Sequence, residues 1–212
     1  MRSKQGFTLA EIIIVVAIMS IIAGIVLFNV STAAKKSRDG DRQADLRTLQ
    51  SAVELYKQKN GRYPAGCRGA GTWSGQTGTS YACASGNQYI VGLAPEFIRA
   101  LPTDKKLLDA NSGYVYTTNA DGTVYKIMAK RTVEDDVVNY SHPFKSCDAT
   151  DSSAGICDAT IASGGSKPNH CQEGATDFRN TYAVWGGFAK GAAGYLNGSV
   201  EHNTELIICD IP

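Results

Sequence analysis

The sequence predicts an α+β fold in which a long N-terminal helix packs on an antiparallel sheet, followed by a loop-rich, disulfide-stapled C-terminal region. Three observations predict it: an uncharged apolar run from Ile12 to Val30, a proline-free amphipathic continuation from Ser31 to Asn60, and two β-rich runs between Gly113 and Lys130. With 212 residues, the chain has room for one domain and an appendage. Lys and Arg (21) balance Asp and Glu (20), which does not suggest a nucleic-acid-binding protein.

The apolar run is long enough to span a membrane. From Ile12 to Val30 only Ser20 and Asn29 are polar, and a bilayer core needs roughly 20 apolar helical residues. A carboxylate, Glu11, lies at the head of this run. Such a group costs on the order of 2.5–3.5 kcal/mol at the centre of a spanning helix, less near an end, and usually has a partner. The segment therefore raises the question of what pairs with Glu11.

Three interpretations compete for the N-terminus. A cleaved secretory signal would use Arg2 and Lys4 as its positive region and Thr32 to Ala34 as its cleavage site, but the apolar run exceeds the usual ~7–15 residues. A plain membrane anchor, with Arg2 and Lys4 on the cytoplasmic side, leaves Glu11 without a purpose. The third interpretation supplies a partner for this carboxylate.

That interpretation rests on the letters GFTLAE, from Gly6 to Glu11, after a short basic leader and before the apolar run. They resemble the prepilin-type signal of type IV pilins and type II secretion pseudopilins. The resemblance implies that a prepilin peptidase cuts after Gly6 and methylates the new terminal amine of Phe7. It also implies the partners: this peptidase/methyltransferase, an inner-membrane assembly platform, the lipid bilayer, other pilins or pseudopilins, and further copies of the chain.

Chemistry fits this interpretation. Cleavage leaves a cationic amine on Phe7, and positions i and i+4 share a helix face, so the amine and Glu11 lie near one end of one stripe. When helices pack with a stagger, the amine of one subunit can meet Glu11 of its neighbour. An opposite charge in low dielectric is strongly favoured over an unpaired one. Glu11 is therefore predicted to set the register of assembly, as the family resemblance also implies.

The helix departs from the family at one place. Many pilins and major pseudopilins carry a proline near the twenty-second mature residue, where this chain has Phe28. The local melting expected of assembled pilins would here rely on Gly24 and Asn29.

Beyond the membrane the helix should continue as one amphipathic segment, with apolar positions at steps of three and four that dock on the sheet. These positions are Leu46, Leu49, Val53 and Tyr56. Gly40 should weaken the helix locally, since glycine costs about 1 kcal/mol against alanine. Gly61 marks its end, with Pro64 beyond. The string LYKQKNGRYP at this end again resembles pilins and pseudopilins.

The sheet and its loops should follow. Asp121-Gly122 between two β-rich runs predicts a hairpin, and Pro95 suits the first turn of a short helix. Further strands are expected at Val137 to Tyr140, Tyr182 to Phe188 and Glu205 to Ile208.

The predicted organisation is a leader removed by the peptidase, a transmembrane or filament-core helix, an amphipathic helix, a Gly/Ser/Thr-rich connecting loop, a sheet region and a variable C-terminal region. Their bounds are 1–6, 7–30, 31–60, 61–88, 89–145 and 146–212. The expected location is the inner membrane, crossed once, with the N-terminus in the cytoplasm and the globular part outside. After assembly the chain would lie in a filament.

An even number of cysteines, all on the expected outer side, favours disulfides. They are Cys67, Cys83, Cys147, Cys157, Cys171 and Cys209. Six cysteines allow 15 pairings. Proximity along the chain suggests Cys67–Cys83 and Cys147–Cys157, which leaves Cys171–Cys209 to hold the tail.

Metal and cofactor sites are not expected. A zinc site would combine cysteines with His142, His170 and His202, but no Cys-x-x-Cys or His-x-x-x-His spacing occurs. Major pseudopilins bind calcium in a loop near the sheet, and this chain has candidate oxygen ligands. They are Glu134, Asp135, Asp136, Asp104, Asp109 and Asn111. Their spacing matches no calcium motif, and solvated surface acids are the simpler interpretation.

No catalytic residues are assigned, because no Gly-x-Ser-x-Gly, Walker or zinc-protease motif occurs. The aromatic residues around Trp185 are expected in the core. The resemblance therefore implies a structural subunit of a pilus or pseudopilus, and not an enzyme. Two alternatives remain: a membrane-anchored binding protein, such as a minor tip adhesin or DNA-uptake subunit, and a tethered extracytoplasmic enzyme.

Overall fold

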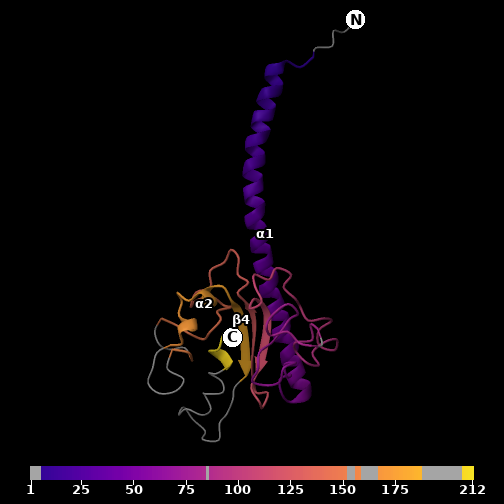
Figure 1. Cartoon of the computed structure of the whole chain (residues 1–212), viewed down its shortest axis with the longest axis vertical. Helices are drawn as coiled ribbons and strands as arrows, with labels where there is room; N and C mark the ends of the chain where they lie inside the picture. The colour runs from indigo at the N-terminus through magenta and orange to yellow at the C-terminus, as the bar shows by residue number, and fades with distance from the viewer. Residues whose placement is uncertain (1–5, 85, 152–155, 159–166, 188–206) are drawn as a thin grey trace.

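A computed structural model describes residues 6–84, 86–151, 156–158, 167–187 and 207–212, with side chains of 26–29 not described. Its main feature is a single helix, α1 (Leu9–Asn60), whose C-terminal half lies in the globular part while its N-terminal half projects away from it (Figure 1). At 1.5 Å per residue this helix is about 78 Å long. Among the described residues, α1 is the one helix long and apolar enough to cross a membrane.

Helix α1 has defined caps and no break between them. It begins after Thr8, which forms an N-terminal capping box with Glu11. It ends at Gly61, whose left-handed φ of 77° lets its N–H bond the carbonyl of Lys57. The helix runs through Gly24 and Gly40 without interruption, so neither glycine divides it.

The sheet has four antiparallel strands in the order β1-β2-β3-β4. They are β1 (Ser74–Gly75), β2 (Gly113–Thr118), β3 (Val124–Lys130) and β4 (Tyr182–Gly187). The hairpin predicted around Asp121-Gly122 joins β2 to β3, and the predicted strand at 182 is β4. Two short helices, η1 (Asn169–Cys171) and α2 (Thr176–Arg179), precede β4 and were not expected.

Both faces of the sheet are covered, which explains why every residue of β2 and β3 is buried. On one face lies α1, through the predicted apolar stripe of Leu46, Leu49 and Val53, all fully buried. On the other face the C-terminal residues 207–212 return across β3, where the Lys126 ammonium donates to the carbonyl of Ile208 at 2.6 Å. The core therefore has three layers: α1, the sheet and the tail.

Two predicted elements are wrong. Val137 to Tyr140 is not a strand, because the backbone N–H groups of Val137 and Tyr140 donate to the carboxylates of Asp136 and Glu173 instead of to a neighbouring strand. The segment at Pro95 forms turns and not a helix, with a single helix-like bond from Phe97 to the carbonyl of Leu93.

The last expected strand, at 205–208, is only partly within the described residues. Ile207 and Ile208 are buried and helical. Residues 205 and 206, and likewise Phe188 at the end of the strand expected at 182–188, lie outside the described residues.

The disulfides agree with one of the three suggested pairs. Cys67 and Cys83 are bonded, with Cα atoms 5.9 Å apart. The other two suggested pairs are wrong: the bonds are Cys147–Cys171 and Cys157–Cys209. Proximity along the chain failed because the returning tail brings Cys209 against Cys157, a partner 52 residues away in sequence.

Replacing Gly187 by alanine should destabilise the fold. Gly187 has a φ of +88°, and an added Cβ would lie 2.0 Å from the carbonyl oxygen of Thr123. Backbone strain and overlap together should lower the free energy of unfolding by about 2–4 kcal/mol, measured by urea denaturation in detergent. The control is Gly174→Ala, where a Cβ meets no atom within 4 Å. Equal stability of the two variants would contradict the register of β3 and β4.

Candidate functional site

The N-terminal end of the described chain is exposed and precedes the helix. Gly6 and Phe7 are not helical, and 86% of Phe7 is exposed. The peptide bond between them is therefore open to another protein, which an internal helical peptide bond would not be. From Leu9 to Ile25 the large apolar side chains are likewise exposed.

Glu11 has partners within its own chain. Its carboxylate accepts from the Thr8 amide at 2.7 Å and from the Thr8 hydroxyl at 2.8 Å. The Glu11 amide in turn donates to the Thr8 hydroxyl at 3.3 Å. Sequence analysis missed Thr8, although the spacing Thr-x-x-Glu before an apolar run is a capping-box signature.

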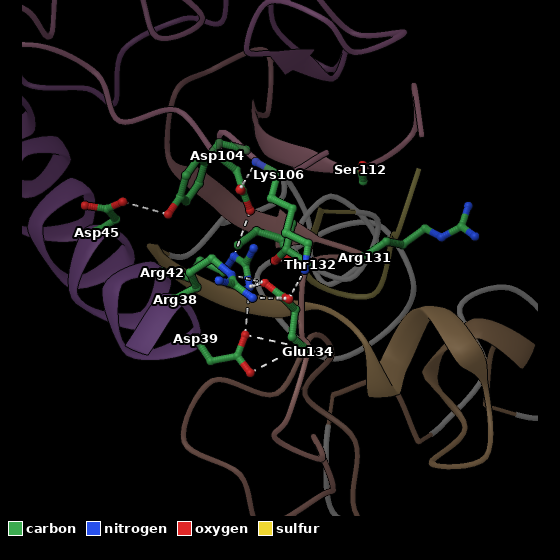
Figure 2. A network of polar contacts seen from close by, with 12 residues as sticks. Arg38, Asp39, Arg42, Asp45, Asp104, Lys106, Ser112, Arg131, Thr132 and Glu134 are labelled. Carbon is green, nitrogen blue, oxygen red and sulfur yellow. Dashed lines mark hydrogen bonds and ion pairs between the residues drawn. The ribbon is translucent and has the colours of Figure 1, made fainter. Parts of the chain in front are cut away.

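A second group of polar residues lies where α1 enters the globular part (Figure 2). At its centre is Arg42, whose side chain is only 4% exposed. Its guanidinium donates to Asp104 at 2.7 Å and to Asp39 at 2.8 Å, and lies 3.1 Å from Glu134. We call Arg42 with these three carboxylates the charge junction. It ties α1 to the loop before β2 and to the loop after β3.

Of the three carboxylates in the charge junction, Glu134 pairs with the largest number of cationic side chains. Arg38 binds it with two N–H groups, at 2.6 and 2.7 Å, and Lys106 also contacts it. These bonds hold the pKa of Glu134 well below its usual range. Asp39 accepts from backbone N–H groups of the same loop, so the carboxylates of the charge junction are bound by cationic side chains and backbone N–H groups of the chain.

The candidate calcium ligands are engaged in the same way. Asp104 and Glu134 belong to the charge junction, and Asp109 lies 3.0 Å from Arg131. Asp136 accepts from the hydroxyl of Tyr182 at 3.0 Å. These carboxylates therefore act as partners of protein groups, while Asp109, Asp135 and Asp136 also remain at the surface as the simpler interpretation expects.

The candidate zinc ligands do come together in part. Cys147, His170 and Cys171 have ligand atoms within 4.8 Å of one another. The two sulfurs are bonded to each other, so neither is the thiolate that zinc requires. His170 points its Nε2 at the carbonyl of Cys209, 2.6 Å away. His202 lies outside the described residues.

His142 is also engaged at both ring nitrogens. Its Nδ1 accepts from the Phe144 amide at 3.1 Å, and its Nε2 lies 3.0 Å from Asp136. A histidine with both nitrogens occupied by its own chain is not placed as a general base for a nucleophile.

The tail is held by a buried lysine on the far side of the sheet. Lys126 is fully buried and donates to the carbonyls of Ile208 and Asp210. Burial lowers the pKa of Lys126 to about 7. The carboxylate of Asp210 accepts from the indole of Trp73 at 2.7 Å. Trp185 was expected in the core, and the structure places it half-buried at the edge of the hydrophobic core.

Comparisons with known proteins match the N-terminal part of the chain. Residues 1–27 match the family model for the prokaryotic N-terminal methylation motif. The chain is 42% identical over 66 residues to type II secretion system core protein G of Klebsiella michiganensis, which covers 30% of this chain and 44% of that protein. It is 34% identical over 70 residues to the same protein of Dickeya chrysanthemi, covering 33% of this chain and 46% of that protein.

The core protein G of Vibrio cholerae is 36% identical over 64 residues, which cover 30% of this chain and 44% of that protein. The matched part thus spans less than half the length of each of these relatives. No solved structure matches the chain significantly.

Replacing Arg42 by methionine should destabilise the protein strongly. The change leaves Asp39, Asp104 and Glu134 crowded without their central cation, and breaking a buried ionic group in this way typically costs about 3–5 kcal/mol. The measurement is the free energy of unfolding by urea. The matched control, Lys59→Met, removes a cation from an exposed pair with Glu96 and should have little effect. If both variants unfold alike, the charge junction does not stabilise the fold.

Lys126 should make stability depend on pH. The folded-state pKa of about 7 lies below the ordinary value of 10.5, so between these values the unfolded chain binds a proton that the folded chain lacks. The free energy of unfolding should therefore rise with pH above 7, by up to about 1.4 kcal/mol per pH unit, and the gain is lost as pH falls to 7.

The pH effect is measured by urea unfolding from pH 7 to 9. In Lys126→Met this rise should disappear, while in the control Lys59→Met it should persist. Parallel curves for the wild type and Lys126→Met would show that Lys126 is not the group responsible.

Proposed function

We propose that this chain, whose methylation motif and similarity to core protein G support the pilin and pseudopilin family, is a structural subunit that polymerises into a type IV pilus or a type II secretion pseudopilus. The observation that carries the proposal is the projecting half of α1. Its large described side chains from Leu9 to Ile25 are 49–78% exposed. So much apolar surface is stable only when lipid or other helices cover it.

The membrane is the first environment that would bury these apolar side chains of α1. An apolar N-terminal helix fits a single-pass anchor, and 19 residues from Ile12 to Val30 span about 28 Å, close to the hydrocarbon thickness of about 30 Å. We propose that the N-terminus lies in the cytoplasm and the globular part outside the inner membrane. The leader charges of Arg2 and Lys4 favour this orientation.

After processing, the α1 helices of neighbouring subunits would bury the same side chains in the filament. We propose that a prepilin peptidase cuts the exposed bond between Gly6 and Phe7 and methylates Phe7. After cleavage Phe7 is the first residue of the chain, and its new cationic amine lies directly before Thr8, where α1 begins. In the separate subunit the donors of Thr8 satisfy Glu11. In the filament the Phe7 amine of a neighbour would add the opposite charge that Glu11 lacks within its own chain.

The proposed partners follow from this sequence of events. They are the peptidase/methyltransferase, the inner-membrane assembly platform, other pilins or pseudopilins, further copies of the chain, and the bilayer. In this proposal the chain is a substrate of the processing enzyme and has no catalytic role of its own.

Processing is tested by mass spectrometry of the chain expressed with a prepilin peptidase. The mature N-terminus should be Phe7 and should be heavier by one methyl group. A control expression without the peptidase should retain Met1. A terminus after Ala34 would identify a secretory signal, and an unprocessed terminus in the presence of the enzyme would favour a plain anchor.

The role of Glu11 is tested by two substitutions that separate charge from capping. Glu11→Gln keeps an oxygen that can accept from Thr8 but removes the negative charge, whereas Glu11→Ala removes both. If charge sets the register, both variants should be processed, and both should assemble at least about tenfold less than wild type, a difference of about 1.4 kcal/mol. Filaments are quantified by shearing and immunoblotting.

Normal assembly of Glu11→Gln alone would mean that capping, and not charge, is what Glu11 supplies. Normal assembly of both variants would show that Glu11 does not set the register, whereas the absence of filaments from the processed wild type would favour an anchored binding protein or enzyme. Glu96→Gln, an exposed acid of the globular part, is the control for a general effect of lost charge.

A further inference from the structure

Lysine side chains gather where α1 leaves the globular part. Lys35 and Lys36 lie on α1 just beyond the apolar run, and Lys105 and Lys106 lie on the loop before β2. We call these four residues the lysine collar. The side chain of Lys36 is 71% exposed and that of Lys106 is 49% exposed, and Lys105 is exposed as well.

The collar is poorly neutralised by the rest of the described chain. Lys35 and Lys105 form no ion pair with a described residue, and Lys36 is 3.8 Å from Asp135. Lys106 shares Glu134 with two arginines.

The acids beneath the collar face inward. Asp39, Asp104 and Glu134 are buried and are bound by Arg42 in the charge junction. The exposed acids at this level are Asp41, Asp135 and Asp136, so three carboxylates face four lysines. The outer surface here is therefore positive.

The helix sets the distance of the collar from the membrane. Lys36 follows Val30 by six residues, which is about 9 Å along a helix. The headgroup region extends roughly 5–7 Å beyond the hydrocarbon on each side. Lys106 lies near the same height, because it contacts Glu134, which binds Arg38 on α1. Long lysine stems can reach back toward phosphates from such positions.

From this arrangement we infer that the lysine collar binds the phosphates of anionic phospholipids on the outer surface of the membrane in the unassembled subunit. The inference rests on the proposed single-pass anchor. A collar fixed at one surface places Glu11, 19 residues before Val30 and so about 28 Å away, at the opposite surface of a bilayer core of about 30 Å. It therefore holds the processed end at the depth where neighbouring subunits would meet it.

The test uses the full chain reconstituted in phosphatidylcholine vesicles, with or without phosphatidylglycerol. The amines are acetylated for a short time, and each lysine is quantified by peptide mass spectrometry. Anionic lipid should slow the modification of Lys36 and Lys105 at least about threefold, and about 1 M salt should abolish the protection, because it shortens the screening length to about 3 Å. Lys59, at the other end of α1, should react equally in both vesicles.

Matched variants separate the collar from nonspecific attraction. In the double variant Lys35→Gln/Lys105→Gln, the factor by which anionic lipid slows acetylation of Lys36 should fall to less than half of its wild-type value. In Lys59→Gln this factor should be unchanged. Equal reactivity of Lys36 and Lys105 in both vesicles, in a chain that resists alkaline extraction, would contradict lipid binding by the lysine collar but not the proposed membrane anchor. A chain that alkaline washing removes from the vesicles would contradict the anchor, and the collar with it.

Discussion

The burial of one guanidinium organises the junction between helix and domain. Arg42 lies on the part of α1 that enters the globular domain, and its charge cannot be buried without partners. Asp39, Asp104 and Glu134 supply them from α1 and from two loops far apart in the sequence. Because each loop contributes a carboxylate to one cation, the loop before β2 and the loop after β3 are held against the same turn of α1.

This junction has a mechanical consequence for the projecting half of α1. The helix is continuous from Leu9 to Asn60, through Gly24 and Gly40, and continuous backbone hydrogen bonding makes it a stiff rod. The unbroken helix therefore links the position of Glu11 to that of Arg42 and the loops bound there. In the proposed filament, the register set at the processed end would fix the position of the globular part as well.

The far side of the sheet is closed by different means. The tail carries few residues, and it is held by a disulfide at Cys209, by the carbonyl bonds from Lys126 and by the hydrogen bond between Asp210 and Trp73. Ile207, Ile208 and Ile211 are buried in the core, and the covalent and polar bonds add to this packing in retaining so short a segment. Burial disfavours the charge of Lys126 and lowers its pKa, and the nearby carboxylate of Asp210 offsets only part of this effect.

Sequence alone determined the features that depend on neighbouring residues. The apolar run, the motif from Gly6 to Glu11, the stripe of α1 and the Asp-Gly hairpin each lie within one continuous stretch of sequence, where periodicity and local backbone preference decide the structure. The capping of Glu11 by Thr8 was equally local and equally readable.

Only the tertiary structure decided what depends on distant partners. It paired Cys157 with Cys209, and it turned Glu134 from a surface acid into a buried partner of Arg42. It also left residues 137–140 without a strand, because the N–H of Tyr140 binds the carboxylate of Glu173, 33 residues away in sequence. Spacing along the chain carries no information about such contacts, since their energy arises only when the fold brings the charges and sulfurs together.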